Sequence, residues 1–177
     1  DESLKVTFEV GTEALRYLPK VSEDDQRTGR ERYRYLLGTV KKLDQRVHVS
    51  VLAVGADEMT EKEQYGTYWE GVEKIDLNPR VIRDRANSLG RKHPEFRSMR
   101  FLGDIHTHPN SVAYPSPQDL ISVARVYDEG MFNPHEPYIF GIAARREDGE
   151  EEINFYRIVR TGSESDYGFK LLEHPDE

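Results

Sequence analysis

The segment DIHTHPNSVAYPSPQDL, residues 104–120, contains the side chains in this chain best suited to bind a metal ion. It holds two of the six histidines, His106 and His108, one residue apart. If RFLGDIHTH forms a strand, both imidazoles project from the same face, because side chains at i and i+2 of a strand share a face. The spacing therefore indicates a pair of imidazoles close enough to bind one small cation.

A third ligand is available further along the chain, in Ser116-Pro-Gln-Asp119. This tetrapeptide is typical of a helix start, and the helix dipole favours a carboxylate in the first turn. From that position Asp119 could point back across the loop toward the two histidines. Two imidazoles and one carboxylate, with one coordination position left open, are a common ligand set of catalytic zinc.

Each half of the segment also has an explanation without catalysis. Two histidines at a strand end are often simply solvated, and a serine and an aspartate three residues apart can cap a helix and do nothing more. Asp104 shares the predicted strand face with the histidines, and it either is solvated or supports the site. His48, His93, His135 and His174 match no pattern and are interpreted as surface residues.

Taken together, however, His-x-His, seven further residues and Ser-x-x-Asp match the signature of the JAMM (MPN+) metalloproteases, and the chain resembles this family. The resemblance implies one catalytic zinc ion, Zn2+, bound by His106, His108 and Asp119. It also implies that the Ser116 hydroxyl stabilises the oxyanion of the tetrahedral intermediate.

The family motif includes an upstream glutamate, and the segment ERYRYLLG matches that part at Glu31, Leu36 and Gly38. The resemblance implies that Glu31 is the general base. Two departures are present: Arg34 stands where the motif usually has its first glycine, and a charged stretch of ten residues precedes Glu31. Glu23, within that stretch, is the nearest alternative.

The elements around the motif predict an α/β chain of the α+β kind, in one domain over residues 1–177. The resemblance implies an MPN-type sheet, mixed but mostly antiparallel, flanked by helices in a cytidine-deaminase-like architecture. Hydrophobic periodicity and turn residues predict the following segments: a strand at 4–10, a short helix at 13–18 ended by Pro19, a charged loop at 21–30, a hairpin of 33–40 and 47–55, a helix from Asn78-Pro79 to Gly90, a strand at 100–108, a helix at 116–127, and strands at 136–145 and 153–160.

The polar stretch Gly55–Gly71 is predicted to be an insertion. It and residues 127–137 lie where family members carry insertions that bind substrate, so Gly55–Gly71 is the expected substrate-binding segment. Trp69, within it, is expected to be a core residue or a substrate contact.

Composition narrows the function classes. The net charge of −8 argues against a nucleic-acid-binding surface. The chain has no cysteine, which excludes thiolate nucleophiles and Cys-based zinc sites. No apolar run is long enough for a membrane span, so a cytoplasmic protein is expected.

The resemblance implies a zinc isopeptidase or peptidase, acting after the C-terminal glycine of ubiquitin or a ubiquitin-like protein. The chain looks most like the stand-alone prokaryotic members that are associated with ubiquitin-like conjugation, some of them linked to antiviral defence. Two alternatives remain: a protease that processes a sulfur-carrier-type ubiquitin-like protein, and an inactive MPN scaffold that only binds. The sequence does not predict an oligomeric state.

Overall fold

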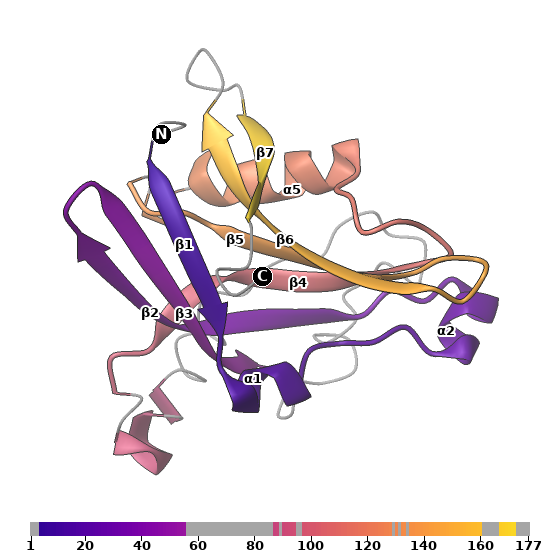
Figure 1. Cartoon of the computed structure of the whole chain (residues 1–177), viewed down its shortest axis with the longest axis horizontal. Helices are drawn as coiled ribbons and strands as arrows, with labels where there is room; N and C mark the ends of the chain where they lie inside the picture. Colours follow the sequence, from indigo (N-terminus) through magenta and orange to yellow (C-terminus); the bar gives the residue numbers. More distant parts are fainter. Residues whose placement is uncertain are drawn as a thin grey trace.

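The computed structural model describes residues 4–55, 87–88, 90–94, 97–128, 130, 132–133, 135–160 and 167–172. In this part of the chain, seven strands form one sheet in the order β1-β3-β2-β4-β5-β6-β7 (Figure 1). The strands are β1 (Lys5–Val10), β2 (Tyr33–Leu43), β3 (Arg46–Gly55), β4 (Arg100–Pro109), β5 (Ile139–Arg145), β6 (Glu151–Arg160) and β7 (Tyr167–Leu172). Helices α1 (Thr12–Arg16), α2 (Glu23–Thr28) and α5 (Pro117–Asp128) accompany them.

The pairing of the strands confirms the predicted fold class. The pairs β1–β3 and β4–β5 are parallel, whereas β2–β3, β2–β4, β5–β6 and β6–β7 are antiparallel. The result is a curled, mixed and mostly antiparallel sheet with few helices. In this arrangement β4, which carries the two histidines of the motif, lies in the middle of the sheet between β2 and β5.

The middle of the sheet is buried on both faces, and β5 shows this most clearly. Ile139 and Ala143 belong to one apolar cluster, together with Ala14 of α1. Phe140 and Ile142 point the other way, into a second cluster that also contains residues of α5. This alternation explains why β5 reads as a continuous apolar run, as strands covered on both faces do.

Gly103 allows β4 to lie close to β5. The register between β2 and β4 shifts at this point, and Gly103 adopts a φ of 149°. A Cβ atom at position 103 would lie 1.8 Å from the carbonyl oxygen of Ile139. Only glycine fits here, and the residues that follow it on β4 enter the candidate site.

Most of the predicted elements are confirmed. The first strand, the first short helix, the hairpin, the histidine strand, the helix after Ser116 and the two later strands all occur, as β1, α1, β2 with β3, β4, α5, β5 and β6. The hairpin is tighter than predicted, because its strands continue to Leu43 and Arg46 and leave a two-residue connection. Gln45 in that connection has a φ of 57°.

The charged segment at 21–30 was predicted to be a loop, and this prediction is wrong, because the segment contains helix α2. Ser22 caps the helix: its Oγ accepts the Asp25 backbone N–H at 3.0 Å, and the Asp25 carboxylate accepts the Ser22 N–H at 3.2 Å. Gly29 ends the helix in the left-handed conformation, with a φ of 69°. Periodicity could not reveal α2, since it has no apolar stripe.

Two further predictions are corrected. No element was assigned to residues 167–172, which form β7 and pair antiparallel with β6. Gly90 was expected to end a helix, but residues 90–92 are still helical, and an interior glycine costs a helix only about 1 kcal/mol. Residues 78–86, where the first part of that helix was predicted, and residues 56–71, where the insertion was predicted, including Trp69, lie outside the described residues.

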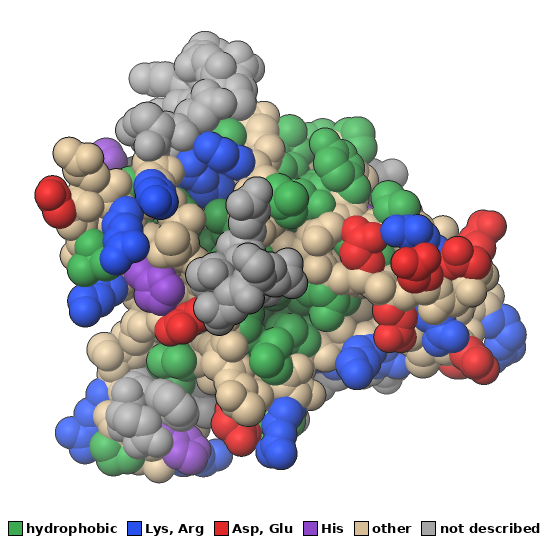
Figure 2. Space-filling view, viewed as in Figure 1, with side chains coloured by type: hydrophobic (Ala, Val, Ile, Leu, Met, Phe, Trp, Pro, Cys, Tyr) green, Lys and Arg blue, Asp and Glu red, His purple; other side chains and the backbone are tan. Residues whose placement is uncertain are grey.

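The surface of the described part mixes charges of both signs. Figure 2 shows acidic and basic side chains interleaved at the end of the molecule where α2 and the turn between β5 and β6 lie. Ion pairs there include Arg146 with Glu150 and Glu152, and Arg27 with Asp24. None of the helices that the structure describes is long and apolar enough to span a membrane.

Candidate metal centre

Strand β4 places His106 and His108 on one face of the sheet, the face that α5 covers. His106 pairs with Tyr33 of β2 and with Ile142 of β5, so its backbone is held from both sides. The His106 ring packs against Phe140 at 5.1 Å between ring centroids. Both histidines are buried, with 4% and 9% of their surface exposed. The alternative of two solvated imidazoles is therefore wrong.

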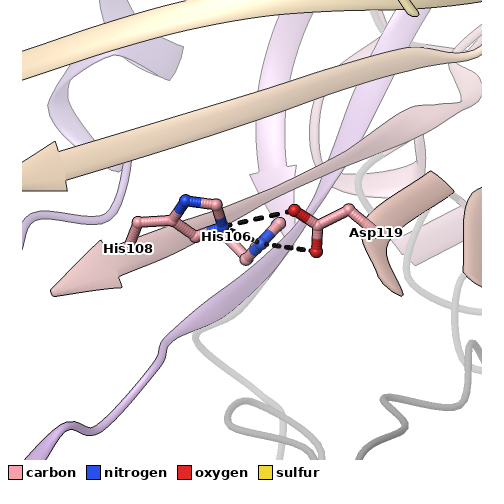
Figure 3. Close-up of side chains that lie close together, drawn as sticks. All are labelled: His106, His108 and Asp119. Atoms are coloured by element: carbon pink, nitrogen blue, oxygen red, sulfur yellow. Dashed lines mark hydrogen bonds and ion pairs between the residues drawn. The ribbon is translucent and has the colours of Figure 1, made fainter. Parts of the chain in front are cut away.

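The start of α5 places Asp119 opposite the two histidines. Ser116 and Asp119 form the predicted cap: the Ser116 N–H donates to Asp119 Oδ2 at 2.8 Å, and the Asp119 N–H donates to Ser116 Oγ at 3.1 Å. These two bonds fix the aspartate side chain against its own helix. The carboxylate then points from the first turn of α5 toward the imidazoles (Figure 3).

The three side chains converge on a common point. The Nε2 atoms of His106 and His108 are 2.9 Å apart. Asp119 Oδ1 lies 3.2 Å from His106 Nε2, and Asp119 Oδ2 lies 3.3 Å from His108 Nε2 (Figure 3). Ligand atoms about 2 Å from a tetrahedral ion are separated by about 3.3 Å. The spacing of the three groups therefore fits a single zinc-sized cation.

The surroundings of His108 select the nitrogen that faces this point. His108 Nδ1 lies 3.2 Å from the carbonyl oxygen of Val112, which can only accept a hydrogen bond. Nδ1 must therefore carry the proton, and in the neutral imidazole Nε2 is left with a free lone pair. A backbone carbonyl that orients a histidine in this way is typical of metal ligands.

The charge of Asp119 also favours a cation. Burial alone would raise the pKa of Asp119, but the hydrogen bonds that His106 and His108 donate through Nε2 when they are protonated outweigh burial and hold the pKa well below its usual value. Burial lowers the pKa of His106, whereas Asp119 raises it, and the net shift is upward. The buried carboxylate of Asp119 thus stabilises a positive charge beside the imidazoles. A bound metal ion would supply that positive charge directly.

Glu31 lies at the edge of this group. Its neighbour Arg32 is bound to β4 at the residue between the histidines: the Thr107 N–H donates to the Arg32 carbonyl at 3.0 Å. Burial raises the pKa of Glu31, and His106 and His108 lower it by electrostatic interaction, with a net upward shift. The alternative, Glu23, is on α2, where its side chain is 89% exposed and 3.9 Å from Arg145.

Asp104 is not solvated, which resolves one alternative left open by the sequence. It is 2% exposed, its Oδ2 accepts a hydrogen bond from the Tyr138 hydroxyl, and it interacts electrostatically with Tyr33. Burial raises the pKa of Asp104 to about 7, although Tyr138 and His106 oppose this shift. The two tyrosines and Val112 were not recognised in the sequence, because each has the pattern of an ordinary core or loop residue.

The remaining expected residues lie away from the three ligands or outside the described part of the chain. His93 and His135 are exposed, and His48 is half-buried beside Thr7 and Glu9. The Gly55–Gly71 segment beyond residue 55 and His174 are outside the described residues. In the described part of 127–137, the Tyr127 hydroxyl donates to the Glu136 carbonyl at 2.8 Å, and Phe132 joins the second core cluster.

The fold and the site together define a class of protein. Its members have a mixed sheet, and the central strand and the adjacent helix bring two histidines and one aspartate together. Comparison of the sequence with protein families gives the family itself. The profile described as prokaryotic homologues of the JAB domain matches residues 20–159. This match spans most of the chain, and the chain belongs to this family.

Other comparisons give less. A search of curated proteins finds no match to this chain. Among solved structures, the chain is similar to a protein of Salinibacter ruber, with 17% identity and a TM-score of 0.45, over 95% of this chain and 92% of that one. It is also similar to a protein of Desulfitobacterium hafniense, with 18% identity and a TM-score of 0.47, over 97% and 94% of the two chains.

Proposed function

We propose that this protein is a zinc-dependent isopeptidase or peptidase. The bond it hydrolyses would follow the C-terminal glycine of ubiquitin or of a ubiquitin-like protein. The observation that carries the proposal is the convergence of His106, His108 and Asp119 on one point beside Glu31, in a member of the prokaryotic JAB family.

His106, His108 and Asp119 would hold the zinc ion, which would occupy the point where their ligand atoms face one another. When bound, zinc would supply two things: a water molecule that ionises near neutral pH, and a positive charge that polarises the carbonyl of the scissile bond. Three protein ligands leave one position open for this chemistry, whereas structural zinc sites use four.

Glu31 would act as the general base and acid. Its carboxylate would accept a proton from the attacking water and deliver that proton to the nitrogen of the leaving amine. Burial shifts the pKa of Glu31 upward, and a stronger base accepts the proton of water more readily.

Ser116 would stabilise the oxyanion that forms on the scissile carbonyl. Its Oγ already accepts the Asp119 N–H, so its own hydroxyl hydrogen is free to donate to another oxygen. The helix cap therefore leaves the donor that this role needs. Such a mechanism requires no covalent intermediate, consistent with a chain that has no cysteine.

The substrate and the pathway rest on the family resemblance. We propose a role in prokaryotic ubiquitin-like conjugation, including antiviral defence systems of that type, in the cytoplasm. A modifier of the sulfur-carrier type would meet the same residues and is a second candidate, so the experiment must distinguish the two.

The decisive experiment combines metal binding with cleavage. Protein purified without metal is titrated with zinc and then incubated with fusions of ubiquitin, conjugation-type modifiers and sulfur-carrier-type modifiers, and the products are identified by mass spectrometry. We expect one equivalent of zinc and cleavage after the terminal glycine of one modifier class. Binding of zinc without cleavage of any fusion would support a scaffold instead.

Substitution of the proposed base tests the mechanism in the same assay. Glu31→Gln should bind zinc normally but cleave about 100- to 10,000-fold more slowly, because it removes the proton acceptor. Glu23→Gln is the matched control, since Glu23 is the alternative base and is exposed. Full activity of Glu31→Gln together with loss of activity in Glu23→Gln would show that the base is wrongly assigned.

A further inference from the structure

The position of Glu31 depends on the residue that follows it. Glu31 lies two residues before Tyr33, the first residue of β2. Arg32 joins the two, so any group that anchors Arg32 also limits where the Glu31 carboxylate can lie.

The backbone of Arg32 is bound directly to the strand that carries the histidines. Its N–H donates to Thr107 Oγ1 at 2.7 Å, and its carbonyl accepts the Thr107 N–H at 3.0 Å. Thr107 lies between His106 and His108 and has none of its surface exposed. One threonine thus fixes the peptide next to Glu31 at the level of the two imidazoles.

Thr107 binds the backbone of Arg32, and Asp25 of α2 binds its side chain. Arg32 Nε donates to Asp25 Oδ2 at 2.7 Å, and Nη2 donates to Oδ1 at 3.1 Å. The Asp25 side chain is fully buried, and that of Arg32 is 23% exposed. A paired contact of this kind fixes the plane of the guanidinium as well as its distance.

Helix α2 is itself fixed to the strand ends around the site. Gln26 Nε2 donates to the carbonyl of Arg146, just after β5, at 2.9 Å. Asn110 Nδ2, just after β4, donates to the Gln26 carbonyl at 2.7 Å. Figure 1 shows α2 at this end of the sheet, where β2 begins and the turn between β5 and β6 lies. Asp25 is therefore presented to Arg32 from a braced helix.

We propose that Asp25 is a positioning residue for Glu31: its buried ion pair with Arg32 holds the start of β2 against Thr107 and keeps the Glu31 carboxylate beside the metal ligands. This inference rests on the proposed function and extends it, because it assigns the charged segment before β2 a role in catalysis.

The test compares Asp25→Asn with Asp24→Asn and Glu31→Gln. Asp24 is the matched control, since it lies on the same helix and pairs with Arg27 on the exposed face. Each protein is loaded with cobalt(II) in place of zinc, and the visible absorption spectrum is titrated with pH. Cobalt affinity and thermal unfolding are measured on the same samples, and kcat and KM are measured on a fusion that the wild type cleaves.

A carboxylate beside the metal disfavours ionisation of water at that metal, so Glu31→Gln should lower the midpoint of the spectral change by about one pH unit. We expect Asp25→Asn to lower the midpoint in the same direction, and Asp24→Asn to match the wild type. The metal affinity of Asp25→Asn should stay at the wild-type value. Its kcat should fall by about 100-fold with little change in KM, as a displaced catalytic group predicts.

Two results would overturn the inference. In the first, Glu31→Gln shifts the midpoint of the cobalt spectral change but Asp25→Asn has the wild-type midpoint. In the second, Asp25→Asn loses metal affinity, which would mean that Asp25 supports the metal ligands and not Glu31. Failure of the wild type to bind cobalt, or an unshifted midpoint in Glu31→Gln, would instead contradict the proposed function on which the inference rests.

Arg32→Lys keeps the test valid if Asp25→Asn does not fold. Lysine retains the charge but cannot make the two-bonded contact with Asp25. We expect this variant to remain folded and to shift the midpoint and kcat in the same directions, by smaller amounts than Asp25→Asn. A folded Arg32→Lys protein identical to the wild type in both measurements would also overturn the inference.

Discussion

Helices α2 and α5 begin with the same local motif, a serine followed three residues later by an aspartate. In α2 the Asp25 N–H donates to Ser22 Oγ at 3.0 Å, and in α5 the Asp119 N–H donates to Ser116 Oγ at 3.1 Å. Each aspartate in turn accepts the backbone N–H of its serine. The two helix starts are nearly identical in hydrogen bonding.

The groups facing the two carboxylates differ, and this difference separates a structural site from a candidate metal site. Asp25 meets the guanidinium of Arg32, which is always charged, so its negative charge is matched within the protein. Asp119 meets two imidazoles, which are neutral unless they take up protons. The carboxylate at the start of α2 therefore already has a cationic partner, whereas the carboxylate at the start of α5 is suited to bind an added cation.

The largest effect is expected when one of the two imidazoles that face Asp119 is removed. His108→Ala should weaken zinc binding by more than about 100-fold, because it removes a ligand outright, and cleavage should be lost with it. Isothermal titration with zinc and the fusion-cleavage assay measure both effects. Asp25→Asn, which alters the other cap, should bind zinc like the wild type; wild-type zinc affinity in His108→Ala would contradict the proposed ligand set.

A smaller effect compares the two serines directly. Ser22→Ala and Ser116→Ala should each lower the free energy of unfolding by about 1 kcal/mol, because each removes one helix cap. Ser116→Ala should also slow cleavage by about 100-fold or more, since it removes the proposed oxyanion donor. Ser22→Ala should slow cleavage much less, because the backbone N–H of residue 22 can still donate to Asp25. Urea unfolding and cleavage rates of both variants test this; equal cleavage rates would leave Ser116 as a cap alone.

The smallest effect concerns the pH dependence of the Asp25 ion pair. Burial raises the pKa of Asp25, but the hydrogen bonds from Arg32 and Ser22 lower it by more. The pKa of Asp25 in the folded protein is therefore below its usual value of 3.8. The stability that this carboxylate contributes is therefore present above the unfolded pKa and is lost as pH falls through the lower folded pKa.

Unfolding of the metal-free protein at different pH values measures this contribution. The wild type should exceed Asp25→Asn in free energy of unfolding at pH 6, and the difference should shrink below about pH 4. A difference that stays constant down to pH 2 would show that the contribution of Asp25 does not depend on its charge.

The closeness of His106, His108 and Asp119 could be predicted from the sequence because both halves of the group are local. His106 and His108 are two residues apart on one strand, and Ser116 with Asp119 forms a helix cap whose geometry follows from four residues. Only their meeting across the loop needed the resemblance to a known motif. The catalytic roles of Glu31 and Ser116 remain predictions.

Helix α2 could not be predicted in the same way. Ser22, Asp25 and Gly29 are the ordinary signals of a helix with caps, but no apolar period accompanies them. Its stabilising contacts reach far along the chain, to Asn110 and to Arg146, and a pattern confined to 21–30 does not contain them. The burial of Asp104 was likewise undetermined, because it depends on Tyr33 of β2 and on Tyr138, which precedes β5.

The short path from Gly29 to Arg32 restricts how the length of the chain can vary. Gly29 is fixed as the end of α2, and Arg32 is bound to Thr107, so only two residues separate two anchored points. A deletion or insertion of one residue there would force either the end of α2 or the contact of Arg32 with Thr107 to move, and Glu31 would move with it. Insertions at Asp44-Gln45, at the far end of the hairpin, would leave that register intact.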